Sequence, residues 1–191
     1  MFNSKMKKIL IIIFIFAFTM LFYALYNKND GMTQTKGASV YYRTYTKEQG
    51  WSKWTKNGLT SGNIKKKYAI KNIQIKVKSN SEKEFTYDLY NTNEKWISEL
   101  DENAKIENKK INAIRIENLG KLGRKYDICY RTYNKKNGWL EWSRNGEING
   151  NRTENISGIQ IKIIPGNVIF REYLKDYDNN ENKSEIGFEQ E

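Results

Sequence analysis

One aromatic motif occurs twice in this chain of 191 residues, with the same internal spacing in both places. The first occurrence is YRTY at Tyr42–Tyr45, followed by GWSKW at Gly50–Trp54. The second is YRTY at Tyr130–Tyr133, followed by GWLEW at Gly138–Trp142. Repetition of this kind indicates that copies of one small unit, each too small to bury its own apolar face, pack against each other.

The two copies also agree beyond the motif itself. Each continues with an Asn-Gly pair, a further glycine and a stretch in which Ile or Val alternates with polar residues. These features are Asn57-Gly58, Gly62 and Ile73–Val77 in the first copy, and Asn145-Gly146, Gly150 and Ile159–Ile163 in the last. Asn-Gly favours a tight turn because both residues tolerate positive φ. The alternation predicts a half-buried β-strand.

A degraded copy lies between these two. Tyr87 and Tyr90 match the tyrosines of the motif, Trp96 matches the first tryptophan, and Ile114–Ile116 matches the alternating stretch. This copy lacks the Gly before its Trp and the Asn-Gly pair, and Glu99 stands where the second Trp would be. The chain therefore contains three repeats. Their predicted ranges are 39–80, 81–123 and 124–166.

The predicted fold class is all-β. Three repeats of three or four strands each are expected to close around a pseudo-threefold axis, as a β-trefoil or a β-prism; both topologies stay open. Ile70 is out of phase with Ile73, so a bulge or tight turn is expected near Lys71 and Asn72.

The predicted C-terminal region, residues 167–191, has two parts. Val168–Leu174 continues the alternating pattern and is expected to add a closing strand to the first repeat. The acidic stretch from Asp176 onward has few apolar residues and is expected to be a mobile tail.

The N-terminal region, residues 1–26, has the pattern of a membrane segment. The stretch Ile9–Tyr26 carries no charged residue, and Lys5, Lys7 and Lys8 precede it. A bilayer-spanning helix needs about 17–25 apolar residues, and flanking lysines tend to stay on the cytoplasmic side. We therefore expect a single-pass signal anchor, a linker over residues 27–38 and an extracellular C-terminal domain. The alternative is a cleaved signal and a secreted protein.

Composition argues against several kinds of chemistry. The chain has no His and one Cys, so it has no Ser-His-Asp machinery, no His-ligated metal and no internal disulfide. Paired carboxylates could hydrolyse glycosides, but neither Glu99 nor Glu141 recurs in all repeats. We expect no enzyme activity, cofactor or metal, and we expect Cys129 to be a buried thiol.

The repeats resemble a known family on these residues. The order Tyr-x-x-Tyr, Gly-Trp-x-x-Trp, Asn-Gly, Gly and an Ile-x-Ile strand is similar to the ChW repeat, a clostridial hydrophobic repeat with a conserved Trp. The resemblance covers about two-thirds of the chain and is fullest in the first and last copies. It implies a bacterial cell-surface or secreted protein that binds surface glycans or proteins, without established enzyme chemistry.

The tryptophans invite two interpretations. Because the first Trp survives in all copies, we expect Trp51, Trp96 and Trp139 to be core residues. The second Trp is lost in the degraded copy, so Trp54 and Trp142 are candidate ligand-binding residues, with packing against a neighbouring copy as the alternative. Residues three apart on a strand face opposite sides, which places the two tryptophans of one motif on different faces. The remaining predicted core residues are Ile73, Ile75, Ile114, Ile116, Ile159 and Ile161.

Cations accompany the second tryptophans. Lys56 and Arg144 stand just before the two Asn-Gly turns and are further candidate binding residues, with solvated turn residues as the alternative. The net charge of +11 suits an anionic partner, although a predicted extracellular domain argues against nucleic acid. The sequence thus favours an adhesion module for a cell-surface protein or glycan. A carbohydrate-active hydrolase and a purely structural envelope protein are the alternatives.

Overall fold

The computed structural model describes residues 38–79, 85–93, 95–101, 104 and 109–186. The predicted membrane segment Ile9–Tyr26 and the predicted linker lie outside these described residues. Within the described ranges, no helix is both long and apolar enough to cross a bilayer.

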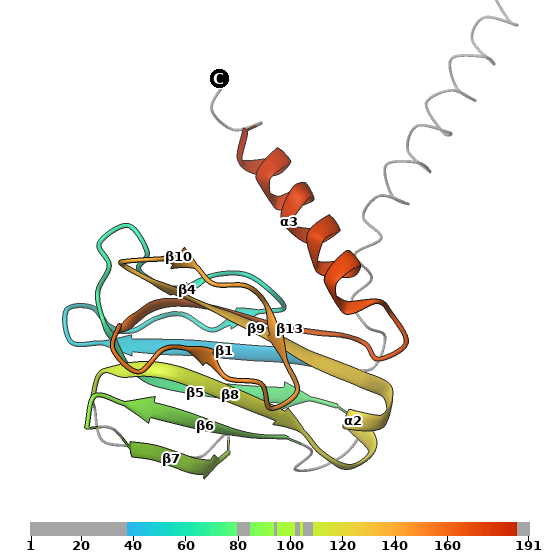
Figure 1. Ribbon diagram of the computed structural model, residues 1–191, viewed down its shortest axis with the longest axis horizontal. Coiled ribbons are helices and arrows are strands. Elements are labelled where there is room, and N and C mark those ends of the chain that lie inside the picture. Colours follow the sequence, from blue (N-terminus) through green and yellow to red (C-terminus); the bar gives the residue numbers. More distant parts are fainter. Residues whose placement is uncertain (1–37, 80–84, 94, 102–103, 105–108, 187–191) are drawn as a thin grey trace, which may run out of the picture. The chain divides into compact units, whose positions relative to one another are not determined.

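The described domain is mostly β-structure, and each repeat builds its own antiparallel sheet (Figure 1). In the first repeat the sheet is formed by β1 (Ser39–Thr46), β2 (Gly50–Trp51), β3 (Thr55–Lys56) and β5 (Ile70–Lys78). In the middle repeat it is formed by β6 (Phe85–Asn91), β7 (Lys95–Leu100) and β8 (Ile111–Asn118). In the third repeat it is formed by β9 (Tyr126–Asn134), β10 (Gly138–Trp139), β11 (Ser143–Arg144) and β13 (Ile156–Pro165).

Two short strands leave their own repeat and join a neighbouring sheet. β4 (Ser61–Gly62) of the first repeat pairs with β13, and β12 (Asn149–Gly150) of the third repeat pairs with β8. Both glycines have positive φ, +108° at Gly62 and +113° at Gly150. A Cβ at either position would run into the backbone of the neighbouring repeat. The recurring glycine is therefore needed where one repeat docks on the next.

Several sequence predictions of local structure are confirmed. The Asn-Gly turns have positive φ at both residues, 41° and 97° at Asn57 and Gly58 and 39° and 84° at Asn145 and Gly146. The pairing of β1 with β5 skips Lys71, which is the expected irregularity next to Asn72. The described strands form three separate sheets rather than one closed barrel.

The core lies where the sheets face each other. The first tyrosine of each repeat is fully buried, and so are all six predicted core isoleucines. These residues are Tyr42, Tyr87, Tyr130, Ile73, Ile75, Ile114, Ile116, Ile159 and Ile161. The predicted core role is wrong for Trp51, which is 37% exposed. Trp96 and Trp139 are half-buried and lie outside the apolar core cluster.

The C-terminal prediction is also wrong. Val168 lies in a turn, and helix α3 (Phe170–Ile186) follows in place of a closing strand and of the first part of the expected tail; residues 187–191 lie outside the described residues. The apolar side chains of its first turns recur at helical spacing, at Phe170, Tyr173, Leu174 and Tyr177. This stripe packs on the third repeat, so tertiary packing, not the short alternation, decides the conformation. A shorter helix, α2 (Gly120–Lys125), joins the middle and third repeats.

Candidate functional site

The first repeat holds one arginine between two tryptophans on the outer face of its sheet. The Arg43 guanidinium carbon lies 4.7 Å from the ring centroid of Trp51 and 4.7 Å from that of Trp54. The Arg43 Nε donates a hydrogen bond of 2.8 Å to Oε1 of Gln74, its cross-strand partner. This bond fixes the guanidinium between the rings, where cation–π attraction favours it.

The two tryptophans of the motif thus contact the same guanidinium and do not lie on opposite faces. The expectation of opposite faces fails because strand β2 ends at Trp51 and β3 begins only at Thr55. The intervening residues are not strand, so the alternation of strand side chains does not apply to Trp54.

The third repeat reproduces this arrangement. Arg131 lies 5.0 Å from the ring centroid of Trp139 and 4.6 Å from that of Trp142. Its Nε donates a hydrogen bond of 2.7 Å to Oε1 of Gln160, again the cross-strand partner.

The middle repeat keeps the arginine but places it on the other strand. Asp88 occupies the position of Arg43, and Arg115 occupies the position of Gln74. The two form a short ion pair, and the Arg115 guanidinium lies 5.1 Å from the ring centroid of Trp96. Each repeat therefore presents one arginine against its first tryptophan, whichever strand supplies the cation.

We name these groups by repeat. The first cluster is Arg43, Trp51, Trp54, Gln74 and Lys76. The middle cluster is Asp88, Trp96, Arg115 and Glu117. The third cluster is Arg131, Trp139, Trp142, Gln160 and Lys162.

Helix α3 covers the third cluster. Asp178 Oδ1 lies 2.9 Å from Nη2 of Arg131, and Trp142 Nε1 donates a hydrogen bond of 3.3 Å to Asp178 Oδ2. The adjacent Tyr177 places its ring 3.8 Å from Nζ of Lys162 and packs edge-on against Trp142. As a result Lys162 is only 6% exposed.

The first cluster is open. Trp54 is 37% exposed, and Lys76 is exposed with its Nζ 4.6 Å from the Trp54 ring centroid. Trp54 is therefore flanked by two cations, Arg43 and Lys76. Among the described residues, Arg43 forms no ion pair.

The apolar base of α3 rests on a second, smaller core. Cys129, Ile164 and Leu174 form a buried cluster, with Phe170 and Trp142 packed against it. Cys129 is a buried free thiol, as the sequence predicts. Burial raises the pKa of this thiol well above its ordinary value, and the nearby Asp127 carboxylate adds to the rise.

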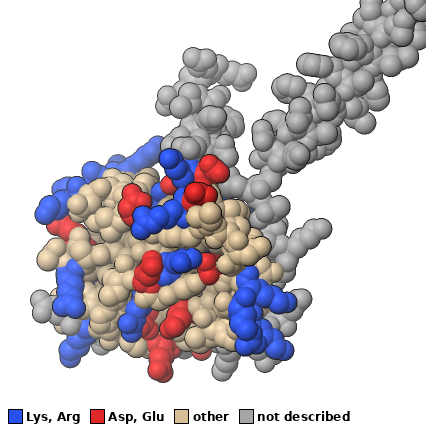
Figure 2. Space-filling model, turned by 45° about the vertical axis from the view of Figure 1, so that its right-hand side comes forward, with Lys and Arg blue, Asp and Glu red and all other residues tan. Residues whose placement is uncertain are grey.

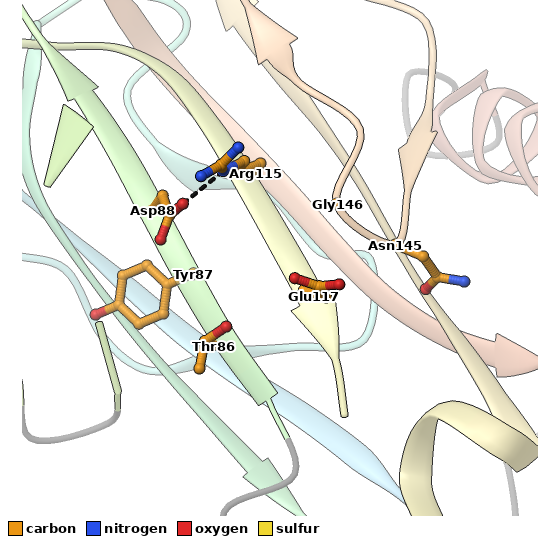
Figure 3. A pocket seen from close by; sticks show the side chains of 7 residues that line it. All are labelled: Thr86, Tyr87, Asp88, Arg115, Glu117, Asn145 and Gly146. Carbon is orange, nitrogen blue, oxygen red and sulfur yellow. Dashed lines mark hydrogen bonds and ion pairs between the residues drawn. The ribbon is translucent and has the colours of Figure 1, made fainter. Parts of the chain in front are cut away.

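The middle cluster borders a polar cavity of about 370 Å³. Figure 3 shows the Asp88–Arg115 pair on neighbouring strands, with Glu117 further along and Asn145 on the turn of the third repeat, its side chain pointing away from the pair. Asp88 and Glu117 supply two carboxylates to one cavity, but Asp88 is engaged by Arg115 and by the backbone N–H of Glu99. Both Asp88 carboxylate oxygens therefore have structural partners within the middle repeat.

The four candidate binding residues have different surroundings. Trp54 is exposed in the first cluster, whereas Trp142 is half-buried beneath α3. Lys56 is exposed and pairs across the sheet with Tyr41, in the row next to Arg43. Arg144 forms an ion pair with Asp127 at 3.1 Å and lies over the ring of Phe170, so it contacts the first turn of α3.

Sequence reasoning missed the arginine and glutamine of the clusters. Arg43 and Arg131 stand at matching positions of the repeat, and so do Gln74 and Gln160. A polar pair repeated among apolar positions was the signal that could have identified them.

Charge on the face seen in Figure 2 is dispersed: Lys and Arg side chains stand at several separate places, with acidic side chains between them. Among the described residues, no group of three or more Cys, Asp or Glu side chains is placed to hold a metal ion.

No family model matches the chain, and no significant match is found among curated proteins or solved structures. The resemblance to ChW repeats stays a prediction.

Proposed function

We propose that this chain is a non-catalytic binding module that recognises a cell-surface protein or glycan through the first cluster. The observation that carries this proposal is the exposure of Trp54 between Arg43 and Lys76. The exposed part of the indole offers apolar contact area to a ligand, and the flanking cations supply charge-assisted hydrogen bonds. The same side chains in the third repeat already hold a protein segment, which supports recognition as the role of this arrangement.

The proposed setting is the outer face of a cell membrane. The uncharged stretch Ile9–Tyr26 after three lysines supports a single-pass anchor, with secretion after cleavage as the alternative. A domain held outside the cell meets surface proteins and glycans rather than nucleic acid. Protease added to intact cells should remove the domain and leave the segment in the membrane fraction. Protection of the domain in intact cells contradicts this setting.

The proposed topology is a pseudo-threefold prism. One strand of the first repeat joins the third sheet, and one strand of the third repeat joins the middle sheet. An equivalent strand from the middle repeat to the first sheet would close the ring. Three separate sheets support a prism better than a trefoil, whose core is one barrel.

The test of the proposed function uses the folded chain on a glycan array and on a peptide array. We expect signals that the Trp54→Ala variant loses. Lys135→Gln is the control, because Lys135 is an exposed cation on the turn between β9 and β10, outside the first cluster. Two results contradict the proposal: no signal on either array, or signals that Trp54→Ala leaves unchanged.

A further inference from the structure

Helix α3 shows what the arrangement of arginine, lysine and two tryptophans accepts. Tyr177 and Asp178 are adjacent in sequence, and together they reach three members of the third cluster. The carboxylate of Asp178 bridges Arg131 and the indole N–H of Trp142. The ring of Tyr177 lies on the Lys162 ammonium and against the Trp142 indole. This segment occupies the third cluster as a ligand would.

The first cluster carries the same five side chains as the third, at the same repeat positions. In strand register, Arg43 pairs with Gln74 as Arg131 pairs with Gln160, and Tyr41 pairs with Lys76 as Cys129 pairs with Lys162. The two clusters differ in solvent exposure: Lys76 of the first cluster is exposed, whereas Lys162 of the third cluster is 6% exposed beneath α3. The first cluster therefore offers the contacts that Tyr177 and Asp178 use, without an occupant among the described residues.

Charge around the first cluster favours an anion more strongly than charge around the third. In the third repeat, Asp127 pairs with Arg144 beside the cluster. Ser39 stands at the position of Asp127 in the first repeat, and Lys56 stands at the position of Arg144. The first cluster thus has Arg43 and Lys76 on the same face of the sheet as the neighbouring Lys56, and it lacks a carboxylate at the position of Asp127.

One sequence difference between the first and third repeats limits which side chains a ligand of the first cluster can carry. Leu174 of α3 packs on the small side chain of Cys129. Tyr41 stands at the position of Cys129 in the first repeat, and we expect its larger side chain to compete for the space that a leucine like Leu174 needs. We therefore expect the first cluster to accept the aromatic and the carboxylate but not a bulky apolar residue three positions before the aromatic. This argues against α3 of a second copy as the occupant.

We infer that the first cluster binds an acidic segment of a partner protein in which an aromatic side chain is followed by a carboxylate. This inference rests on the proposed function and names its ligand class: the chemistry that Tyr177 and Asp178 supply to the third cluster, delivered from another chain to the first. Peptide is favoured over glycan because the occupant seen in the equivalent place is a protein segment.

The test is a titration of the full chain into a fluorescent peptide, followed by anisotropy. The peptide has the sequence of residues 170–182 with Leu174→Ala, and a side-chain link between positions 171 and 175, both exposed in α3, holds it helical. We expect saturable binding that weakens at least about tenfold in the chain variant Lys76→Gln and further in Arg43→Gln/Lys76→Gln. The same loss is expected when the peptide carries Asp178→Asn or Tyr177→Ala. Restoring Leu174 in the peptide should also weaken binding.

Three controls keep the result interpretable. Lys135→Gln removes one exposed cation elsewhere and should leave the affinity unchanged. Lys76 is an exposed residue, so Lys76→Gln is expected to leave the fold intact, which circular dichroism checks. Arg131→Gln identifies exchange: if this variant and not Lys76→Gln abolishes binding, the peptide replaces α3 on the third cluster, and the inference is overturned.

The two proposals fail differently. If the peptide does not bind while a sulfated or uronate-bearing oligosaccharide binds in a Trp54-dependent manner, the ligand is a glycan; the inference is then wrong and the proposed function stands. If neither probe binds and both arrays are blank, both proposals are wrong. Peptide binding that is insensitive to Lys76→Gln and Arg43→Gln also overturns the inference.

Discussion

Asp178 and Arg131 are 47 residues apart in the sequence, and their side chains form an ion pair at 2.9 Å. The pair is partly shielded, with the Arg131 side chain 13% exposed and that of Asp178 33% exposed. It joins a helix that comes after the repeats to a cluster inside the third repeat. This contact stabilises α3 on the third repeat. Because the same cluster recurs in the first repeat, the contact also indicates which chemical groups the clusters bind.

Substituting Asp178→Asn should loosen α3 without unfolding the sheets. The change removes a charge-assisted contact with Arg131, which we expect to lower the free energy of opening the helix by about 1–2 kcal/mol. Cys129 reports the opening, because its thiol is fully buried and packs on Leu174. The rate of Cys129 labelling by a thiol reagent should rise roughly five- to thirtyfold.

Asp176→Asn is the matched control, because Asp176 is an exposed carboxylate on the same helix. It should leave the Cys129 labelling rate within twofold of the parent, a range that ordinary surface substitutions give. Equal rates for the Asp178→Asn variant and this control would show that the Arg131 contact does not hold α3 in place.

The contact between repeats should depend on glycine at position 62. Gly62→Ala would place a Cβ against the backbone of Ser157 at a residue whose φ is +108°. Gly50→Ala has a similarly unfavourable φ of +73°, but no atom lies within 4 Å of the added Cβ. We expect Gly50→Ala to cost about 1 kcal/mol of unfolding free energy from backbone strain alone, and Gly62→Ala about 2–4 kcal/mol.

Urea denaturation of both variants measures this difference. Equal losses of stability would mean that β4 does not dock tightly on β13, which would weaken the proposed ring of repeats.

The sequence predicted what is local or repeated, and it failed where a distant segment decides. The alternation at Ile73–Val77 and the Asn57-Gly58 turn were sufficient to predict strands and turns, because side-chain period and positive φ are properties of the local chain. Helix α3 was missed because its apolar stripe has a partner only in the folded third repeat, at Cys129 and Ile164. The first cluster was predicted only in part. Trp54 was identified from the motif, but Arg43 was missed because its position beside the ring depends on pairing with Gln74 across two strands.

Stability should fall as the pH rises above the ordinary range of a thiol. Burial raises the pKa of Cys129 in the folded protein, so the unfolded chain loses this proton first. The unfolded state then binds fewer protons than the folded state, so the free energy of unfolding begins to decrease near pH 8.5, with a slope that approaches about 1.4 kcal/mol per pH unit above it. Burial also raises the pKa of Tyr87 and Tyr130, which add to the loss only above about pH 10.

The window from about pH 8.5 to 9.5 therefore isolates the cysteine. Urea unfolding of the parent and of Cys129→Ala across this window should give a falling line and a flatter one. The slope is compared rather than the absolute stability, because removing the thiol also leaves a small cavity. Parallel lines would show that the Cys129 thiol does not stay protonated in the folded protein.

The middle repeat predicts which double substitution the first repeat tolerates. Asp88 and Arg115 stand where Arg43 and Gln74 stand in the first repeat, and the cation reaches the tryptophan from the opposite strand. Arg43→Asp alone places a carboxylate beside Gln74 and against Trp54, whose ring face repels an anion. We expect this single change to lower the free energy of unfolding by about 1–2 kcal/mol.

Adding Gln74→Arg to Arg43→Asp should recover most of that loss, because it recreates the ion pair of the middle repeat and returns a guanidinium to the tryptophan. Gln74→Arg alone is expected to destabilise the sheet, since it sets two cations opposite each other at Arg43 and position 74. A double-mutant cycle by urea denaturation therefore predicts a favourable coupling energy of about 1 kcal/mol or more. Additive single effects would show that an ion pair at these two positions does not stabilise the first cluster.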